Sequence, residues 1–164
     1  MSQISDVTGV VAGLLLYQGG LQAQLEEAAA AEQAPGIKIP PQQIVSRNMA
    51  PEVAEKSTAT RYPAVHVYCE KYVNDQREKF RTFSGEAQMA IDLRVSSDRV
   101  EELEPQMNLL LDALTSTLDQ NRGDLGSGVF YGGGYEITPG PVKLGGRNFL
   151  QTAKVTFNLE VSRD

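Results

Sequence analysis

The sequence contains a single histidine, His66, and a single cysteine, Cys69. These are its first candidates for a general base and a nucleophile. A histidine that acts as a general base needs a nucleophile and an orienting acid beside it, and the sequence contains no GxSxG nucleophile motif. Cys69 falls on the apolar side of an alternating segment, where a thiol is usually buried and inert. We therefore expect structural roles for both residues and predict that the protein is not an enzyme.

The glycine-rich stretch GSGVFYGGGYE has the composition of a phosphate-binding loop but lacks the GxxxxGK[ST] pattern. No helical pattern follows it that would offer a helix N-terminus to a phosphate. We expect a strand in which the glycines permit a bulge or a close backbone approach. The acidic pairs Glu26–Glu27 and Glu101–Glu102 lie on predicted helices with no histidine nearby, so we expect solvated helix faces, with no metal and no cofactor.

A basic cluster interleaved with aromatic residues is the remaining candidate for binding. It comprises Lys71, Arg77, Lys79 and Arg81, flanked by Tyr72, Phe80 and Phe83 and interrupted by Glu70, Asp75 and Glu78. The chain as a whole carries a net charge of −6, whereas a general nucleic-acid binder is expected to present a basic surface. A polar hairpin or a subunit contact is therefore a better interpretation of this cluster than nucleic-acid binding.

The composition is that of one soluble globular domain. The 164 residues are 41% hydrophobic and 22% charged, ordinary values for a single domain. One cysteine excludes an internal disulfide and fits synthesis in a reducing compartment. The apolar stretch VVAGLLLY is too short to cross a bilayer, and the first basic residue is Lys38, so we expect neither a membrane span nor a secretory signal.

The N-terminal half divides into a helix and a connector. Residues 1–33 carry apolar side chains at helical intervals from Ile4 to Ala28, which predicts an amphipathic helix with a bend or break near Gly19. Pro35 and Gly36 should end it. Residues 34–61 hold four prolines among polar residues, and we expect an extended connector without a helix.

Residues 62–164 are predicted to form a core of strands and one helix. Period-two alternation predicts strands in YPAVHVYCE, in EAQMAIDLRVSS and in the closing LQTAKVTFNLEVSRD. Between them, an apolar stripe from Val100 to Leu118 predicts a helix, with Asp98 and Glu101 as a capping box and Pro105 in its first turn or at a kink. A glycine-interrupted strand and a long loop should then precede the closing strand.

This order predicts an α+β domain. We expect a small antiparallel or mixed four-stranded sheet, with the N-terminal helix and the second helix packed on one face. Within it, Val155, Phe157 and Leu159 should share a core with Met89, Ile91 and Leu93, covered by the helix around Leu110, Leu111 and Leu114.

The sequence of segments resembles a known family. An amphipathic N-terminal helix and a proline-rich connector lead into YPAVHVY, FSGEAQMAIDLRVSS, the helix VEELEPQMNLLLDALTSTL, a glycine-rich strand with Tyr135 and the closing NFLQTAKVTFNLEV. Together they resemble the tail terminator, or tail completion, proteins of long-tailed bacteriophages, which join tail to head. The similarity covers most of the chain, and none of its motifs is a catalytic signature.

The resemblance implies a structural virion protein made in the host cytoplasm. Copies would assemble into a ring, expected to be a hexamer, that caps the tail tube and meets the neck proteins of the head. DNA would pass through the lumen without specific binding, past an acidic wall. The candidates for contacts between subunits or with partners are Lys71, Asp75, Arg77, Lys79, Arg81, Lys143, Arg147 and Asn148.

Three alternatives stay open on the sequence. The first is a neighbouring connector or adaptor protein of the neck. The second is an enzyme with a site assembled around His66, Asp92 and Tyr135, and the third is a small-ligand or regulatory binding module.

Overall fold

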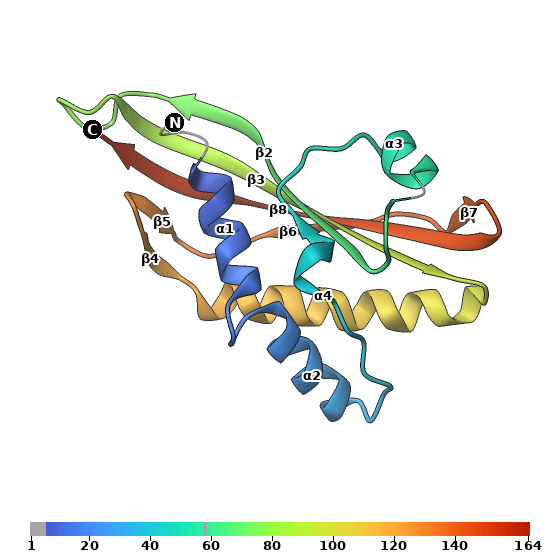
Figure 1. Cartoon of the computed structure of the whole chain (residues 1–164). Helices are drawn as coiled ribbons and strands as arrows, with labels where there is room; N and C mark the ends of the chain where they lie inside the picture. Colours follow the sequence, from blue (N-terminus) through green and yellow to red (C-terminus); the bar gives the residue numbers. More distant parts are fainter. Residues whose placement is uncertain (1–5, 58) are drawn as a thin grey trace.

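A computed structural model describes residues 6–57 and 59–164 and contains a curled sheet with helices packed against it (Figure 1). The predicted stripe residue Ile4 lies outside the described residues. The helices are α1 (Asp6–Leu16), α2 (Leu21–Ala31), α3 (Pro51–Lys56) and α4 (Leu103–Gln120), with short 3-10 turns at Pro41–Gln43 and Val100–Glu102. The strands are β1 (Ile44–Val45), β2 (Ala64–Asn74), β3 (Phe83–Ser97), β4 (Gly123–Gly126), β5 (Val129–Tyr131), β6 (Glu136–Pro139), β7 (Lys143–Gly145) and β8 (Asn148–Arg163).

The expectation of a small four-stranded sheet is wrong, because residues 6–57 and 59–164 form an α+β fold with an eight-stranded mixed sheet and four α-helices. Strands follow the order β1-β2-β3-β8-β5-β4, and β6 and β7 also pair with β8. Among the described strand pairs, β1–β2 is parallel and the others are antiparallel. The extra strands are two to four residues long, too short for a period-two pattern to show in the sequence.

The closing strand β8 lies in the middle of the sheet. It pairs with β3 along fifteen residue pairs, from Phe83–Arg163 to Ser97–Phe149. Its other edge pairs with the short strands β5, β6 and β7 in turn. The regular alternation of β8 therefore reflects two paired edges and one buried face.

The predicted N-terminal helix is two helices, α1 and α2, separated at the expected break near Gly19. At Gly20 a Cβ atom would lie 2.5 Å from the carbonyl oxygen of Leu14 and 2.6 Å from that of Leu15. Only glycine fits so close to the end of the preceding helix. The chain turns there, so that α1 and α2 both pack against the core.

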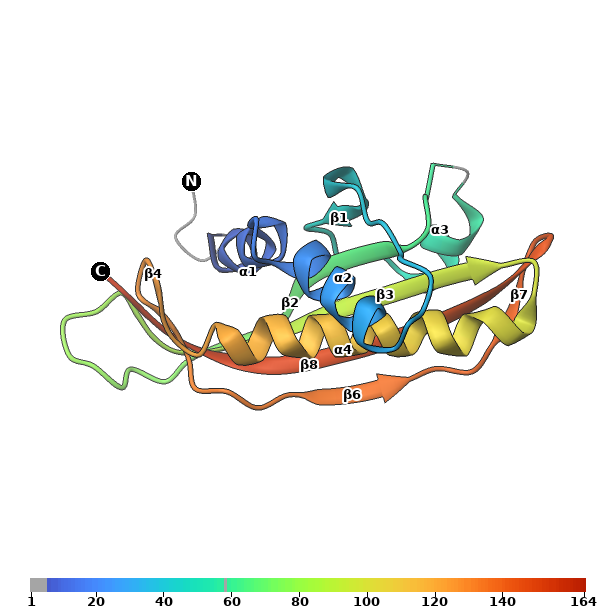
Figure 2. The ribbon, with the colours of Figure 1, turned by 90° about the horizontal axis from the view of Figure 1, so that it is seen from below.

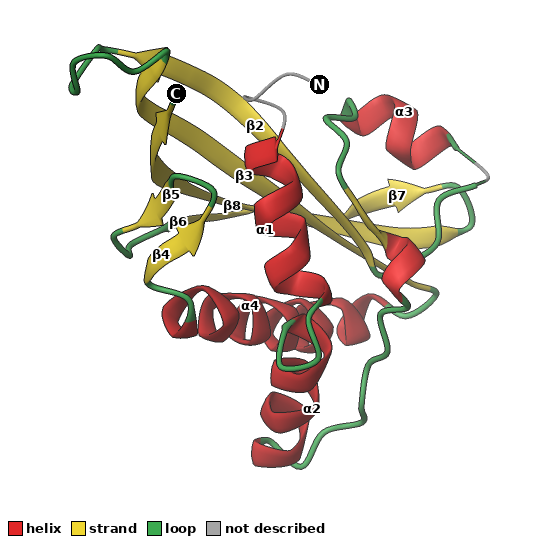
Figure 3. Ribbon diagram, turned by 60° about the vertical axis from the view of Figure 1, so that its left-hand side comes forward, coloured by secondary structure: helices red, strands yellow, loops and turns green. Residues whose placement is uncertain are grey.

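The predicted extended connector is wrong in part. Residues 34–61 contain a 3-10 turn, the strand β1 and the helix α3. Pro51 is the first residue of α3, a position where the missing N–H removes no helical hydrogen bond. Figure 3 shows α3 beside β7 and away from the other helices, which lie together on one side of the sheet. The connector therefore reaches the side of the sheet that these helices leave uncovered.

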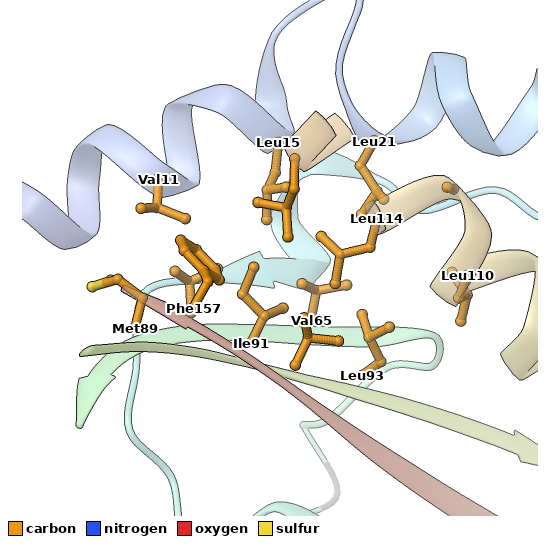
Figure 4. Packing of buried hydrophobic residues seen from close by; sticks show 14 of the residues in the cluster. Val11, Leu15, Leu21, Val65, Met89, Ile91, Leu93, Leu110, Leu114 and Phe157 are labelled. Atoms are coloured by element: carbon orange, nitrogen blue, oxygen red, sulfur yellow. The ribbon is translucent and has the colours of Figure 1, made fainter. Parts of the chain in front are cut away.

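The predicted core is confirmed. Met89 is opposite Phe157 and Ile91 is opposite Val155 across β3 and β8, so their side chains share one face. Leu110 and Leu114 of α4 pack on this face with Val11 and Leu15 of α1 (Figure 4). Leu111 is only partly buried at the margin of this cluster.

The start of α4 follows one expectation and departs from another. Pro105 is the third residue of α4 and lies in its first turn, as one of the two interpretations predicted. The capping box is wrong, since neither the 3-10 turn nor α4 has a side-chain cap. Ser97 takes that place: its hydroxyl accepts a hydrogen bond from the Arg99 N–H at 3.1 Å and donates one to Glu102 at 2.8 Å.

Candidate assembly surfaces and a buried polar cluster

The face of the sheet opposite the helices carries a polar cluster, formed by the buried residues His66, Asp92 and Arg94 and the half-buried Tyr68. The Arg94 guanidinium donates to His66 Nδ1 at 2.5 Å and lies 3.5 Å from Asp92 Oδ2. The Tyr68 hydroxyl donates to the same carboxylate at 3.2 Å. The side chain of Arg94 is 0% exposed, and Arg47 and Thr60 of the connector line the pocket beside His66. The connector therefore flanks this cluster at His66.

Burial controls the protonation of the cluster. Burial lowers the pKa of His66, and the positive charges of Arg94 and Arg47 lower it further. Burial also raises the pKa of Asp92, and this effect outweighs the attraction of Arg94. A neutral imidazole can accept the Arg94 hydrogen bond, whereas an imidazolium cannot.

We expect His66 to make the protein less stable as the pH falls below about 6.5, the pKa of an unperturbed histidine. Below that pH the unfolded chain binds a proton at His66 while the folded chain, with its lowered pKa, does not. The free energy of unfolding therefore decreases as the pH falls toward the pKa of the folded state. Urea unfolding at pH 7 and pH 5.5 checks this, with His66→Gln as the control that cannot titrate. Equal pH dependence in the two proteins would contradict it.

The enzyme alternative requires Tyr135 beside His66 and Asp92, and the structure unites only the last two. His66 is opposite Asp92 across β2 and β3. Tyr135 precedes β6 on the far side of β8, where it lines a different pocket with Gln88 and Glu136. His66 is only 5% exposed. The three residues therefore do not form one site.

The basic cluster of the sequence falls largely at the hairpin tip, residues 75–82 between β2 and β3. Arg77 forms ion pairs with Asp75 at 2.7 Å and with Glu86 at 3.0 Å. Arg81 pairs with Glu78 at 3.3 Å and with the C-terminal residue Asp164. Arg77 and Arg81 are therefore each paired with one acidic side chain of the tip and one outside it.

Hydrogen bonds to side chains fix the shape of the hairpin tip. Asn74 accepts from the Ser84 N–H at 3.0 Å and donates to the Thr82 carbonyl at 3.1 Å. The Glu78 N–H donates to the Ser84 hydroxyl at 2.9 Å. The loop therefore has a defined shape supported by its own side chains.

The aromatic residues of the cluster separate into two kinds. Tyr72 and Phe83 pack edge to face, with ring centroids 6.3 Å apart, against the core. Phe80 is 101% exposed at the hairpin tip, on a residue with φ of +66°. Sequence reasoning grouped the three aromatics, because nothing in the sequence separates a packed ring from an exposed one.

The remaining candidates lie at the β7 corner, residues 142–148, at the other end of the sheet. Lys143 forms an ion pair with Glu55 of α3. Arg147 and Asn148 are exposed in the turn into β8. Leu144, which follows Lys143 and was not among the predicted residues, is 73% exposed.

The two groups of candidates therefore do not form one surface. The hairpin tip adjoins the Phe83–Arg163 end of the β3–β8 ladder and the β7 corner adjoins the Ser97–Phe149 end (Figure 1). At ~3.3 Å per residue these ends are separated by roughly 45 Å. Lys71 lies between them, exposed on β2 near the hairpin.

The described part of the chain offers no cluster of three or more histidine, cysteine or acidic side chains that would hold a metal ion. Within the same residues, no helix is long and apolar enough to cross a membrane.

Comparisons with known proteins give this chain no family. No protein-family model matches the sequence, and no curated protein matches it.

Proposed function

We propose that this protein is a structural virion protein that forms a ring at the head-proximal end of a bacteriophage tail. There it terminates the tail tube and joins it to the neck of the head. Its partners are further copies of itself, the tail tube protein and the neck proteins. The proposal starts from the resemblance in the order of segments to tail terminator proteins.

The observation that carries the proposal is the placement of two different exposed surfaces at opposite ends of one long sheet. The hairpin tip presents Phe80 and the β7 corner presents Leu144, each among charged residues. A ring forms when one patch of each copy docks on a different patch of the next. Two unlike ends on a rigid sheet suit such head-to-tail contacts.

The acidic balance supports the same role. A net charge of −6 disfavours adhesion of a subunit to the DNA backbone. A ring through which DNA moves without specific binding benefits from such a balance. In this proposed structural role the protein catalyses no reaction.

Deleting the gene from a phage that encodes this protein is expected to give tails of aberrant length that fail to join heads. A plasmid copy of the gene should restore normal particles and serves as the control. Electron microscopy of lysates measures tail length and head attachment together. Tails of normal length that fail to join heads would favour the neck alternative, and normal tails that join heads efficiently would refute the proposal.

A further inference from the structure

We propose that Phe80 at the hairpin tip docks into an acidic groove on the next copy of this chain, and that this contact links subunits in the ring. The inference rests on the proposed function and adds the residues of the contact. It starts from the most exposed aromatic side chain among the described residues and asks which surface would cover it.

Phe80 has the properties of a preformed anchor. Its ring is 101% exposed, and its backbone has φ of +66°, a conformation that phenylalanine rarely adopts. The hydrogen bonds of Asn74 and Ser84 hold the loop in this shape before any partner binds. A rigid aromatic side chain loses little conformational freedom on binding, and such side chains supply much of the affinity at interfaces.

The acidic groove consists of two adjoining pockets, of about 340 and 650 Å³, between α4, the end of α2 and the segment that follows α2. Its apolar floor includes Ile37, Pro105 and Leu109, and its rim carries Glu32, Glu101 and Asp112. None of the described residues that line the two pockets is basic. Glu32, Glu101 and Asp112 make no ion pair with any described residue.

Charge matches the anchor to the groove. Lys79 precedes Phe80, is exposed and forms no ion pair within the described ranges, unlike Arg77 and Arg81. An apolar ring beside an unpaired ammonium group fits an apolar floor with an unpaired acidic rim. Complementary charges of this kind set the register of a contact and exclude wrong partners.

The same copy cannot supply both surfaces of the contact. Ile137, which lines the groove, pairs with Val155, which in turn pairs with Ile91 of β3. Ile91 lies eight residues from the start of β3, or about 25 Å along the strand. The hairpin tip extends beyond that end of the sheet, away from α4 (Figure 2). Phe80 therefore reaches only the groove of another copy, which makes the contact head-to-tail.

Cross-linking between two different single-cysteine variants tests the contact. Both variants carry Cys69→Ala, and one adds Thr82→Cys while the other adds Asn108→Cys. Thr82 is exposed two residues from Phe80 and Asn108 lines the groove, so both cysteines leave Phe80, Lys79 and the acidic residues in place. A short bismaleimide should join them into a heterodimer when they are mixed at high concentration. The matched control replaces Thr82→Cys with Leu144→Cys, an exposed position at the β7 corner.

The proposal expects cross-linked heterodimer well above the Leu144→Cys control, and it expects none from the Thr82→Cys variant alone. Adding Phe80→Ala to the Thr82→Cys variant should reduce the yield to that of the control. Adding Lys79→Glu instead should lower the yield about threefold, the order expected for an exposed charge pair, and adding Glu101→Lys to the Asn108→Cys partner should restore it. A yield equal to the control, an equal yield from the Thr82→Cys variant alone, or a yield that Phe80→Ala leaves unchanged overturns the contact.

These outcomes are independent of the test of the proposed function. Rings at the tail end without the cross-link would leave the function standing and refute the Phe80 contact. If the cross-link forms but a deletion phage makes normal tails that join heads, the Phe80 contact stands and the proposed function is refuted.

Discussion

Replacing Phe157 with alanine is expected to lower the free energy of unfolding by about 3–5 kcal/mol. Phe157 lies on the inner face of β8, opposite Met89, and is 5% exposed. Its ring centroid is 5.4 Å from that of Tyr131. Truncation removes buried apolar surface and leaves a cavity among side chains from the sheet and α1.

The cavity is expected to stay open because Tyr131 is fixed in place. Its hydroxyl donates to the Gly134 carbonyl at 2.9 Å, and burial, aided by the charge of Asp119, raises its pKa to about 12. A ring held by that hydrogen bond does not collapse into the space left by Phe157. The loss should therefore fall in the upper part of the range for large-to-small substitutions.

Urea unfolding at low protein concentration measures the effect, with Phe80→Ala as the control. Phe80 undergoes the same chemical change at a fully exposed position and should alter the free energy of unfolding by less than about 0.5 kcal/mol. Similar losses in both variants would show that burial of Phe157 does not stabilise this fold as described.

The long strands were predictable because their alternation repeats many times. In β3 and β8 the pattern extends over fifteen and sixteen residues, so the inward positions Met89 and Phe157 follow from period two alone. In β5 the inward residues Val129 and Tyr131 flank the exposed Phe130, and three residues give no period. Pairing with β8, a long-range contact, makes that segment a strand.

The connector shows a second reason for failure. Pro35, Pro40 and Pro41 favour extended chain, and the sequence prediction applied this preference to all of residues 34–61. Pro51 instead begins α3, and Ala54 of that helix is completely buried. A six-residue helix is too short to be stable alone, so tertiary packing determines it.

The candidate surfaces were only partly predictable. Charges at the hairpin tip were foreseeable, because a hairpin brings neighbouring residues together. The exposure of Phe80 was not, since an aromatic side chain is more often buried. The acidic groove combines Glu32 with Asp112, eighty residues apart in sequence, and only the packing of α2 on α4 joins them.

Replacing Arg94 with alanine is expected to cost about 3–5 kcal/mol of stability, the range for removing one member of a buried charge pair. Its position on the outer face of β3 predicts an exposed side chain, yet it is 0% exposed. Truncation would leave the Asp92 carboxylate and His66 buried without their common partner.

The pH dependence of this loss separates charge from packing. Burial already raises the pKa of Asp92, and without the Arg94 guanidinium that pKa should rise further. The folded variant then binds a proton at Asp92 more readily than the unfolded chain, so its stability deficit should shrink as the pH falls from 7 to 5. Removal of Arg94 also lets His66 accept a proton, which acts in the same direction.

The double variant Arg94→Met, Asp92→Asn is the matched control, because it removes both charges and keeps most of the volume. Replacing a buried ion pair by neutral groups of similar size is often nearly neutral, so the double variant should lose less stability than Arg94→Ala. Its stability deficit relative to the unsubstituted protein should also change less between pH 7 and pH 5 than the deficit of Arg94→Ala does. A double variant less stable than Arg94→Ala at both pH 7 and pH 5 would contradict this expectation. Arg94 would then stabilise the fold through the packing of its side chain and not by compensating the charge of Asp92.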